Sequence, residues 1–376
     1  MTLGILGGGQ LAKMLANEAY RLGLNIAIID NGDNTPAGDM TKNNFTAGWN
    51  SRAELDKFIG VSDVITLENE FISPDILAYI ATLKPVYPSA ETLRLVQDKF
   101  IQKNTFAKNN IPLPGYAAID SIADLNQFGS QYDYPFIIKT RTLGYDGYGN
   151  YKVENENDCE VGWNKFNSDG KNRELMAEEF IDFEKEVAVM VTRNKCGEVA
   201  VYPCVETIQR NHICHQVIAP AQIDIDLAFI AQETAVKAVE AIDGVGVFGV
   251  EMFVTTAKSI LVNEIAPRPH NSGHYTIEGC YCSQYENAIR AIFDLPLGST
   301  EMVKPAACMI NLLGTRNGIG VPENISSTLK ETHTKLHLYN KKECRIGRKM
   351  GHITTIADTI ENAIKEATNA YNHFVW

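Results

Sequence analysis

Apolar and polar positions alternate along the first 95 or so residues in a way that is typical of a parallel α/β unit. Leu3 to Leu6 is a short apolar run, and apolar residues then recur at helical spacing from Leu11 to Leu22. A second run, NIAIID, ends at Asp30, and the segments Val61 to Leu67 and Lys84 to Ser89 continue the alternation. This pattern predicts a doubly wound, Rossmann-like sheet.

The rest of the chain divides into a small unit and a larger, strand-rich one. We expect a helix from about Ala90 to Asn109, and a strand at Pro135 to Thr140 ahead of a glycine-rich loop. Longer apolar runs from about Glu174 surround a helix near Ile225 to Ile242, and DTIE at Asp358 has the form of a capping box that opens the last helix. The predicted domains are 1–95, 96–174 and 175–376, the last with a small terminal subdomain from about 300.

Composition places the chain among ordinary globular proteins. It has 376 residues, 45% of them hydrophobic and 21% charged, and its formal net charge of −12 argues against nucleic-acid binding. No apolar run is long enough to cross a bilayer and no signal-peptide pattern opens the chain, so we expect a soluble, cytoplasmic protein without membrane contact. The eight scattered cysteines favour free thiols over a disulfide framework or a zinc site.

The N-terminal glycines, in GGGQLA, fit the pattern G-x-G-x-x-A of a dinucleotide-binding turn. Such a turn brings an anion to a helix N-terminus, where backbone N–H groups and the helix dipole favour negative charge. Asp30 stands where a ribose-binding carboxylate is expected, which supports a nicotinamide enzyme. Many α/β sheets with other ligands begin in the same way, so both interpretations stay open at this point.

A lysine at a strand end, Lys139, leads into a loop that contains Gly144, Gly147 and Gly149. Glycines at this density let backbone N–H groups approach phosphate oxygens and let a loop close as a lid. The chain lacks the G-x-x-x-x-G-K-[ST] pattern of a Walker A loop, and a plain hairpin turn is the alternative interpretation.

Two glutamates, Glu251 and Glu264, lie in neighbouring apolar runs, GVEMFVTT and KSILVNEI. A hairpin that turns at Ala257 and Lys258 would place them directly opposite each other on one face. Facing carboxylates repel unless a cation lies between them, and together with Asn263 they form an oxygen ligand set that suits Mg²⁺. A solvated acid pair on an edge hairpin is the alternative.

Polar donors concentrate directly after Glu264, in EIAPRPHNSGH. Prolines on both sides of Arg268 restrict the backbone and hold the guanidinium in place. The other donors of this stretch are His270, Asn271, Ser272 and His274. So many donors in one short stretch favour a functional loop over a merely structural one.

A basic cluster near the C-terminus consists of Lys341, Lys342, Arg345, Arg348 and Lys349. In so acidic a chain it fits capture of a small phosphorylated substrate better than nucleic acid, with a solvated basic face as the alternative.

Taken together, these features resemble the ATP-grasp superfamily. Within it, the stretches GILGGGQLAKM, QDK, IIKT with GYDGYG, FEKEVAV, VIAPA, VFGVEMFV, NEIAPRPHNSGHYT and GRKMGHIT are similar to those of the N5-carboxyaminoimidazole ribonucleotide synthetase family, from residue 3 to about 354. The resemblance implies an ATP-grasp fold, with a Rossmann-like N-terminal domain, a small mobile lid domain and a C-terminal α+β domain. It also implies an ATP-dependent ligase of purine synthesis, a homodimer that carboxylates aminoimidazole ribonucleotide with bicarbonate through carboxyphosphate and uses ATP and Mg²⁺.

The resemblance also assigns roles to individual residues. It implies ATP contacts from Arg94, Lys99, Lys139, Gly144, Tyr145, Asp146, Gly147, Tyr148, Gly149, Asn150, Glu178, Glu179, Phe180, Ile181, Glu186, Gln209, Asn263 and Glu264. It implies substrate contacts from Gly9, Gln10, Glu70, Asp146, Asn271, Ser272, Lys341, Arg348 and Lys349. The implied catalytic residues are Tyr145, Asp146, Arg268, His270 and Lys341, and the implied metal ligands are Glu251 and Glu264.

The chain departs from the family pattern in the lid, where Tyr148 replaces a basic residue and Asn150 replaces a glutamine, and at Gln209, which replaces a histidine. The motif T-Y-E-F-E-N of the N-terminal domain reads TLENEF here, from Thr66 to Phe71, so both acids are kept and their neighbours change. These changes bear on ATP affinity more than on reaction class. The alternatives are another ATP-grasp ligase or carboxylase, such as formate-dependent glycinamide ribonucleotide transformylase or biotin carboxylase, and, more distantly, an NAD-dependent oxidoreductase.

Overall fold

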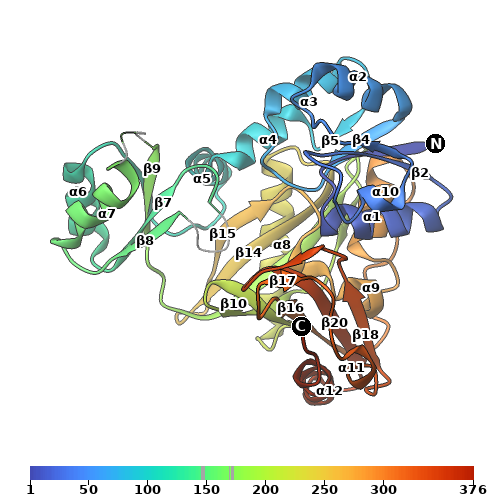
Figure 1. The fold of residues 1–376 in the computed structure, drawn as a ribbon. Helices are drawn as coiled ribbons and strands as arrows, with labels where there is room; N and C mark the ends of the chain where they lie inside the picture. The colour runs from blue at the N-terminus through green and yellow to red at the C-terminus, as the bar shows by residue number, and fades with distance from the viewer. Residues whose placement is uncertain (145–148, 169, 171–172) are drawn as a thin grey trace.

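The computed structural model describes residues 1–144, 149–168, 170 and 173–376. Figure 1 shows three units in chain order: an N-terminal α/β unit in blue, a small unit in green at the left, and a large unit that runs from yellow-green to red at the C-terminus. The hydrophobic pattern predicts the parallel α/β unit, whereas the antiparallel pairing in the two units that follow is seen only in the structure.

The N-terminal unit is built on a five-stranded parallel sheet in the order β3-β2-β1-β4-β5. Its strands are apolar because helices pack against both faces, and Leu3, Ile5 and Ile28 are fully buried. The strand order changes direction at β1, so the carboxyl ends of β1 and β4 border the crevice where sheets of this kind bind ligands. The elements are β1 (Thr2–Leu6), α1 (Gln10–Arg21), β2 (Asn25–Ile29), the short helix η1 (Gly38–Met40), β3 (Asn43–Phe45), α2 (Arg52–Val61), β4 (Val64–Leu67), α3 (Pro74–Ala81), β5 (Val86–Tyr87) and α4 (Ala90–Gln97).

The small unit is a four-stranded antiparallel sheet, β6-β9-β7-β8, that shares one core with two helices. Helix α5 (Lys99–Lys108) leads from the N-terminal unit into it. Its elements are β6 (Tyr116–Ile119), α6 (Ile122–Tyr132), β7 (Phe136–Thr140), β8 (Asn150–Val153), α7 (Asp158–Asn167) and β9 (Leu175–Glu179).

The large unit is built on a nine-stranded antiparallel sheet, β15-β14-β10-β12-β13-β16-β20-β18, with β11 beside β10. One face packs against α8, and the other shares a core with α1 and α10, which joins this sheet to the N-terminal unit. The strands are β10 (Phe183–Arg193), β11 (Val199–Val201), β12 (Val205–Arg210), β13 (Ile213–Ala219), β14 (Gly246–Thr255), β15 (Ile260–Ala266), β16 (Ala306–Leu313), β18 (Thr334–Leu338) and β20 (Lys349–Ala357), with β17 (Gly318–Ile319) and β19 (Glu343–Cys344) as a separate pair. The helices are α8 (Ile225–Ala241), η2 (Asn271–Gly273), α9 (Thr276–Gly279), α10 (Gln284–Ile292), α11 (Ile325–Thr328) and α12 (Ile360–Asn372).

The single helix expected from Ala90 to Asn109 is wrong, because the chain breaks at Asp98 into α4 and α5. Asp98 has an extended backbone, and its carboxylate accepts the N–H groups of Phe100 and Ile101 at 2.9 and 3.1 Å. An acid that caps the following turn competes with continuation of the helix.

The capping box expected at Asp358 is displaced by one residue. Thr359 is the N-cap of α12 and accepts the N–H of Asn362 at 3.2 Å, whereas the Asp358 carboxylate pairs with Lys304 at 2.7 Å. The pairing with Lys304 removes Asp358 from the competition for the helix N-terminus.

All eight cysteines are free thiols, as the sequence predicts. Among the residues that the structure describes, no helix combines the length and apolar character that a membrane crossing requires.

Three histidine rings form a row: His337 of β18 stacks on His352 of β20, and His274, from the segment after β15, lies tilted against His352. The ring centroids of His337 and His352 are 4.4 Å apart and those of His352 and His274 are 4.8 Å apart. His274 and His352 are almost completely buried. The Nδ1 atom of each ring forms a hydrogen bond with a tyrosine hydroxyl at 2.9 Å. Burial, reinforced by the neighbouring histidines, lowers the pKa of both rings well below the ordinary value.

Because the unfolded histidines take up protons below about pH 6.5 and the buried ones do not, the free energy of unfolding should fall as pH decreases from about 6.5. Each such histidine contributes a slope of up to about 1.4 kcal/mol per pH unit. Urea unfolding between about pH 5.5 and 7.5 measures the slope, which should become shallower in His352→Gln and stay unchanged in His373→Gln, at the exposed C-terminal end of α12. An unaltered slope in His352→Gln would contradict the assignment.

Candidate active site

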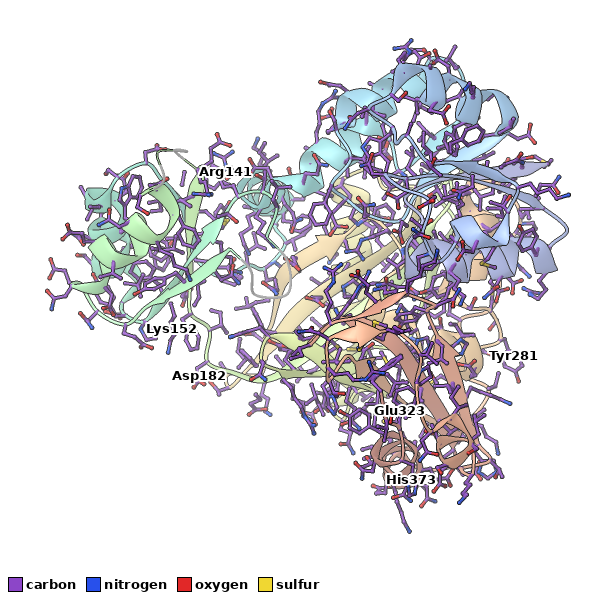
Figure 2. The ribbon with its side chains drawn as sticks, in the orientation of Figure 1. Arg141, Lys152, Asp182, Tyr281, Glu323 and His373 are labelled. Atoms are coloured by element: carbon purple, nitrogen blue, oxygen red, sulfur yellow. The ribbon has the colours of Figure 1, made fainter. Side chains whose placement is uncertain are left out.

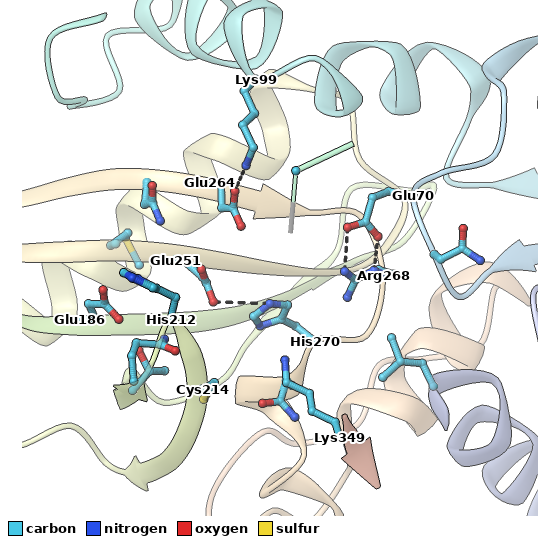
Figure 3. Close-up of a pocket in the computed structure, with 18 of the residues that line it drawn as sticks. Glu70, Lys99, Glu186, His212, Cys214, Glu251, Glu264, Arg268, His270 and Lys349 are labelled. Carbon is cyan, nitrogen blue, oxygen red and sulfur yellow. Dashed lines mark hydrogen bonds and ion pairs between the residues drawn. The ribbon is translucent and has the colours of Figure 1, made fainter. Parts of the chain in front are cut away.

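A cavity of about 460 Å³ lies where the three units meet (Figure 3). Many of the predicted site residues line it: Gln10, Glu70, Lys99, Lys139, Gly144, Asn150, Glu186, Gln209, Glu251, Asn263, Glu264, Arg268, His270, Asn271 and Lys349. They come from segments far apart in the chain, so the fold brings together what the sequence pattern could only suggest separately. Four predicted residues, Tyr145, Asp146, Gly147 and Tyr148, lie outside the described residues.

The floor of the cavity is the hairpin of β14 and β15, where Glu251 pairs directly with Glu264 as predicted. The turn and the strand geometry that produce this pairing differ from the prediction. The strands turn over residues 256–258, and an extra residue in β15, Asn263, shifts the register between Met252 and Glu251. Alternation of side chains is broken at this bulge, so Asn263 and Glu264 both line the cavity while the residues on either side, Val262 and Ile265, enter the core.

Lysines from two other elements approach this carboxyl-rich hairpin. Lys99, at the start of α5, forms an ion pair with Glu264 (Figure 3), and Lys139, near the end of β7, donates to the Asn263 side-chain oxygen at 3.4 Å. Lys139 also pairs with Glu178 at 2.5 Å. Cationic side chains of this kind are suited to hold the phosphate groups of a nucleotide.

The two facing glutamates have opposite protonation tendencies. Burial and the charge of Glu264 raise the pKa of Glu251, whereas the charge of Lys99 lowers the pKa of Glu264. Among the residues described here, no group of three or more His, Cys, Asp or Glu is arranged to hold a metal ion. The ion pair of Lys99 with Glu264 nevertheless compensates only one of the two carboxylates. Two carboxylates and the Asn263 amide oxygen form a ligand set that fits a divalent cation.

Arg268 and His270 form the wall next to the hairpin. Arg268 forms a two-point ion pair with Glu70, in which Nε and Nη2 both donate and the Nη2 to Oε1 distance is 2.8 Å (Figure 3). Burial raises the pKa of Glu70, but the charge and the hydrogen bonds of Arg268 together outweigh this effect and keep the pKa below its ordinary value. Burial, with the Arg268 charge, lowers the pKa of His270 to about 3, so its imidazole is neutral near pH 7. Its Nδ1 lies 2.8 Å from Ser272 Oγ and its Nε2 lies 3.5 Å from Glu251 Oε1.

The N-terminal glycine turn is occupied by the protein's own carboxylates. Glu68, at the end of β4, accepts the N–H groups of Gly9 at 2.7 Å and Ala12 at 3.2 Å, and Asp30 accepts the N–H of Gly8 at 2.7 Å. Asp30 is therefore engaged with the turn rather than placed as an open ribose-binding acid. The N–H groups of Gly8, Gly9 and Ala12 are therefore not open to an anion in this structure, Gln10 lines the cavity, and the substrate contact expected at Gly9 stays a prediction.

Several predicted residues lie away from the described lining of the cavity. Arg94 pairs with Asp75 at 2.9 Å, Glu179 accepts the N–H of Gly115 at 2.9 Å, and Arg348 donates to the Glu343 carbonyl at 2.8 Å. The others are Gly9, Gly149, Glu178, Phe180, Ile181, Ser272 and Lys341.

Lys341 has an environment that is unusual for a lysine. Its ammonium donates to the Lys349 carbonyl at 2.8 Å, and burial followed by the charge of Arg348 lowers its pKa to about 7. The position next to the cavity-lining Lys349 keeps the basic cluster connected to the site.

Two charged residues that matter for the geometry are not predicted from the sequence: Glu68, which lines the cavity, and Lys103, which does not. Glu68 was visible only as one acid of TLENEF, and its partner Gly9 is 59 positions away. Lys103 is 2% exposed and pairs with Glu178 at 2.6 Å. Its signal was the spacing: Lys99 and Lys103 are four residues apart and so share one helix face, where like charges repel unless acids lie nearby.

Comparisons with known proteins agree with this geometry. A ribonucleotide synthetase preATP-grasp domain model matches residues 1–97, an ATP-grasp domain model matches 104–285, and a phosphoribosylaminoimidazole carboxylase C-terminal domain model matches 307–366. The predicted ATP-grasp fold is confirmed.

Individual relatives cover nearly all of the chain. The N5-carboxyaminoimidazole ribonucleotide synthase of Bacillus subtilis is 35% identical over 369 residues, 98% of this chain and 95% of that protein. The phosphoribosylaminoimidazole carboxylase of Candida albicans is 40% identical, but the chain spans only 65% of its length. The crystal structure of N5-carboxyaminoimidazole synthase from Aspergillus clavatus with ADP and 5-aminoimidazole ribonucleotide is 36% identical, with a TM-score of 0.90 and coverage of 99% and 98% of the two chains.

The fit of Glu68 against the glycine turn gives a test at Gly9. A Cβ there would lie 2.4 Å from Glu68 Oε1, so Gly9→Ala should push the carboxylate off the N–H groups and lower the free energy of unfolding by about 1–2 kcal/mol. Chemical denaturation measures the change. Gly60→Ala is the matched control, because a Cβ at that helical glycine meets nothing within 4 Å. In a Glu68→Ala background the Gly9→Ala effect should shrink, and an equal effect in both backgrounds would contradict the contact.

Proposed function

The chain belongs to the N5-carboxyaminoimidazole ribonucleotide synthetase family of ATP-grasp enzymes, and we propose that it carboxylates 5-aminoimidazole ribonucleotide with bicarbonate, converting ATP to ADP and phosphate. The observation that carries the proposal is the cavity where the lysine pair and facing glutamates meet Arg268 and neutral His270. A nucleotide phosphate site and a small-anion site are thereby adjacent. The homodimer that the resemblance implies stays a prediction.

ATP binds along the small unit and the hairpin in this proposal, with its phosphates toward Lys99 and Lys139. Glu251, Glu264 and the Asn263 amide would hold Mg²⁺, because the acid pair exceeds the positive charge that Lys99 supplies. When bound, the ion would neutralise phosphate charge. Transfer of a phosphoryl group depends mostly on positioning and charge neutralisation, which these lysines provide from fixed elements.

Bicarbonate is a poor electrophile, so one of its oxygens must first become a phosphate leaving group. The bicarbonate oxygen attacks the γ-phosphorus of ATP, ADP leaves, and carboxyphosphate forms. Arg268 offers the positive charge for this anion, while His270 stays neutral and can accept a hydrogen bond or a proton through one ring nitrogen. The exocyclic amine of the ribonucleotide then forms the C–N bond, phosphate leaves, and the amine loses a proton.

The ribonucleotide enters next to the N-terminal unit in this proposal. Gln10, Glu70, Asn271 and Lys349 line that part of the cavity, and the basic cluster beyond Lys349 favours the substrate phosphate. Glu68 and Asp30 already accept hydrogen bonds from the N–H groups of the glycine turn. In this proposal the substrate phosphate is therefore bound mainly by Lys349 and its neighbours Lys341 and Arg348.

A coupled assay of ADP release tests the proposal directly. ADP should form steadily only when ATP, aminoimidazole ribonucleotide and bicarbonate are all present, and omission of any one should lower the rate to background. Glycinamide ribonucleotide with formate should not replace the substrate pair. Steady ADP release with that second pair alone would move the chain to the other ATP-grasp reaction.

Substitution of Glu264 tests the phosphate and metal site. Glu264→Gln keeps the shape but removes the charge that binds Lys99, so ATP turnover should fall by about 100-fold or more while the thermal unfolding transition is retained. Glu184→Gln is the matched control, because Glu184 also pairs with a lysine of this hairpin, Lys258, but is exposed and distant from the cavity lining described above. Near-normal turnover in Glu264→Gln would refute the assignment.

A further inference from the structure

Lys103 is a buried cation directly behind the phosphate side of the cavity. It lies one turn after Lys99 on α5, on the same helix face, and is 2% exposed. The described residues that line the cavity include Lys99 but not Lys103. A lysine is rarely buried this completely unless it is paired, so its contacts should reveal its role.

The contacts of Lys103 close a ring of polar groups. Its ammonium pairs with Glu178 Oε2 at 2.6 Å, and Glu178 Oε1 pairs with Lys139 at 2.5 Å. Lys139 donates to the Asn263 side-chain oxygen at 3.4 Å, and Lys103 donates to the Asn263 main-chain carbonyl at 3.3 Å. The ring therefore joins α5, the small-unit strands β7 and β9, and the bulge of β15.

The structure assigns to Lys103 the role of a positioning residue: through Glu178 and the Asn263 bulge it holds the Lys139 ammonium at the nucleotide phosphate site without touching the nucleotide itself. This inference rests on the proposed function, which makes Lys139 a phosphate contact. It names a residue whose effect on the reaction passes entirely through other groups.

Charge balance explains why a second lysine is needed. With Lys139 alone, the Glu178 carboxylate would cancel the Lys139 charge and compete with a phosphate for it. With two lysines on one carboxylate, a net positive charge remains for the ligand. The charges of Lys103 and Lys139 outweigh burial and lower the pKa of Glu178 to about 2, so the carboxylate stays ionised and keeps both partners.

The ring also fixes Lys139 relative to the metal-binding hairpin. The N-terminus of α5 is tied to the small unit at a second point, where Asp98 pairs with Arg141 at 2.5 Å and the Lys99 N–H donates to the Arg141 carbonyl at 2.8 Å. Arg141, labelled in Figure 2, lies where the small unit faces α5. Two points of attachment oppose rotation of the small unit about α5. Lys103 therefore helps to fix the position of the small unit relative to β15.

A purely structural ion pair is the competing explanation. Buried ion pairs are weak stabilisers compared with apolar packing of the same volume, so stability alone does not account for a buried lysine here. A structural pair also has no reason to converge on a main-chain carbonyl of a cavity-lining residue in the bulge.

Magnesium-ADP binding by calorimetry and ADP release in the full assay test the inference in parallel. Lys103→Met should weaken ADP binding about tenfold and lower kcat about 10- to 100-fold, with KM for the ribonucleotide changed less than about twofold. Lys103→Arg, which keeps the charge, should restore part of the affinity. Lys108→Met, on an exposed position of the same helix, is the control and should match the wild type.

A double-mutant cycle separates positioning from structure. In a Lys139→Met background, Lys103→Met should change ADP affinity by less than about twofold, because its target is gone. Wild-type ADP affinity and kcat in Lys103→Met, or an undiminished effect in the Lys139→Met background, would overturn the inference.

If Lys103→Met does not fold, Lys103→Met/Glu178→Gln removes both charges of the pair, and unchanged ADP affinity in that variant would also overturn it. A wild-type protein that binds ADP but never turns over would refute the proposed function and leave the binding cycle to decide the role of Lys103.

Discussion

In a regular antiparallel hairpin, successive side chains point to opposite faces, so Asn263 and Glu264 could not both reach one cavity. The extra residue in β15 removes this restriction and leaves Glu264 opposite Glu251. Three lysines contact this distortion: Lys99 pairs with Glu264, Lys139 donates to the Asn263 amide oxygen, and Lys103 donates to the Asn263 main-chain carbonyl. A bulge-free hairpin would keep the sheet and lose the site.

The same region shows how a cavity can hold several like charges without a destabilising excess. Glu264 and Glu70 are each paired with a cation from another element, Lys99 and Arg268. Glu251 is paired with no lysine or arginine among the described residues, and burial with the charge of Glu264 raises its pKa. The position with the least compensation is the one where a divalent cation is proposed, and this is the electrostatic reason for placing it there.

Much of the fold followed from periodicity, because strands and helices of the N-terminal unit depend on local patterns of apolar residues. The facing of Glu251 and Glu264 was predicted from a regular hairpin, but the structure reaches it with a different turn and the extra residue Asn263, so the rest of the predicted register is wrong. The bulge was signalled by the broken alternation at Asn263 but was not inferred, and the break at Asp98 was missed because helical periodicity continues across it. Glu68 and Lys103 could not be found in this way, since their partners are brought to them only by the packing of sheets distant in sequence.

The carboxylate of Glu68 at the start of α1 gives the glycine turn a resident competitor for any anion. A phosphate could bind those N–H groups only by displacing a tethered acid whose effective concentration far exceeds that of a free metabolite. The N–H groups of Gly9 and Ala12 are thus satisfied within the chain itself. For sequences with the same glycine pattern, an acid placed directly after the fourth strand would distinguish a self-filled turn from one open to a cofactor.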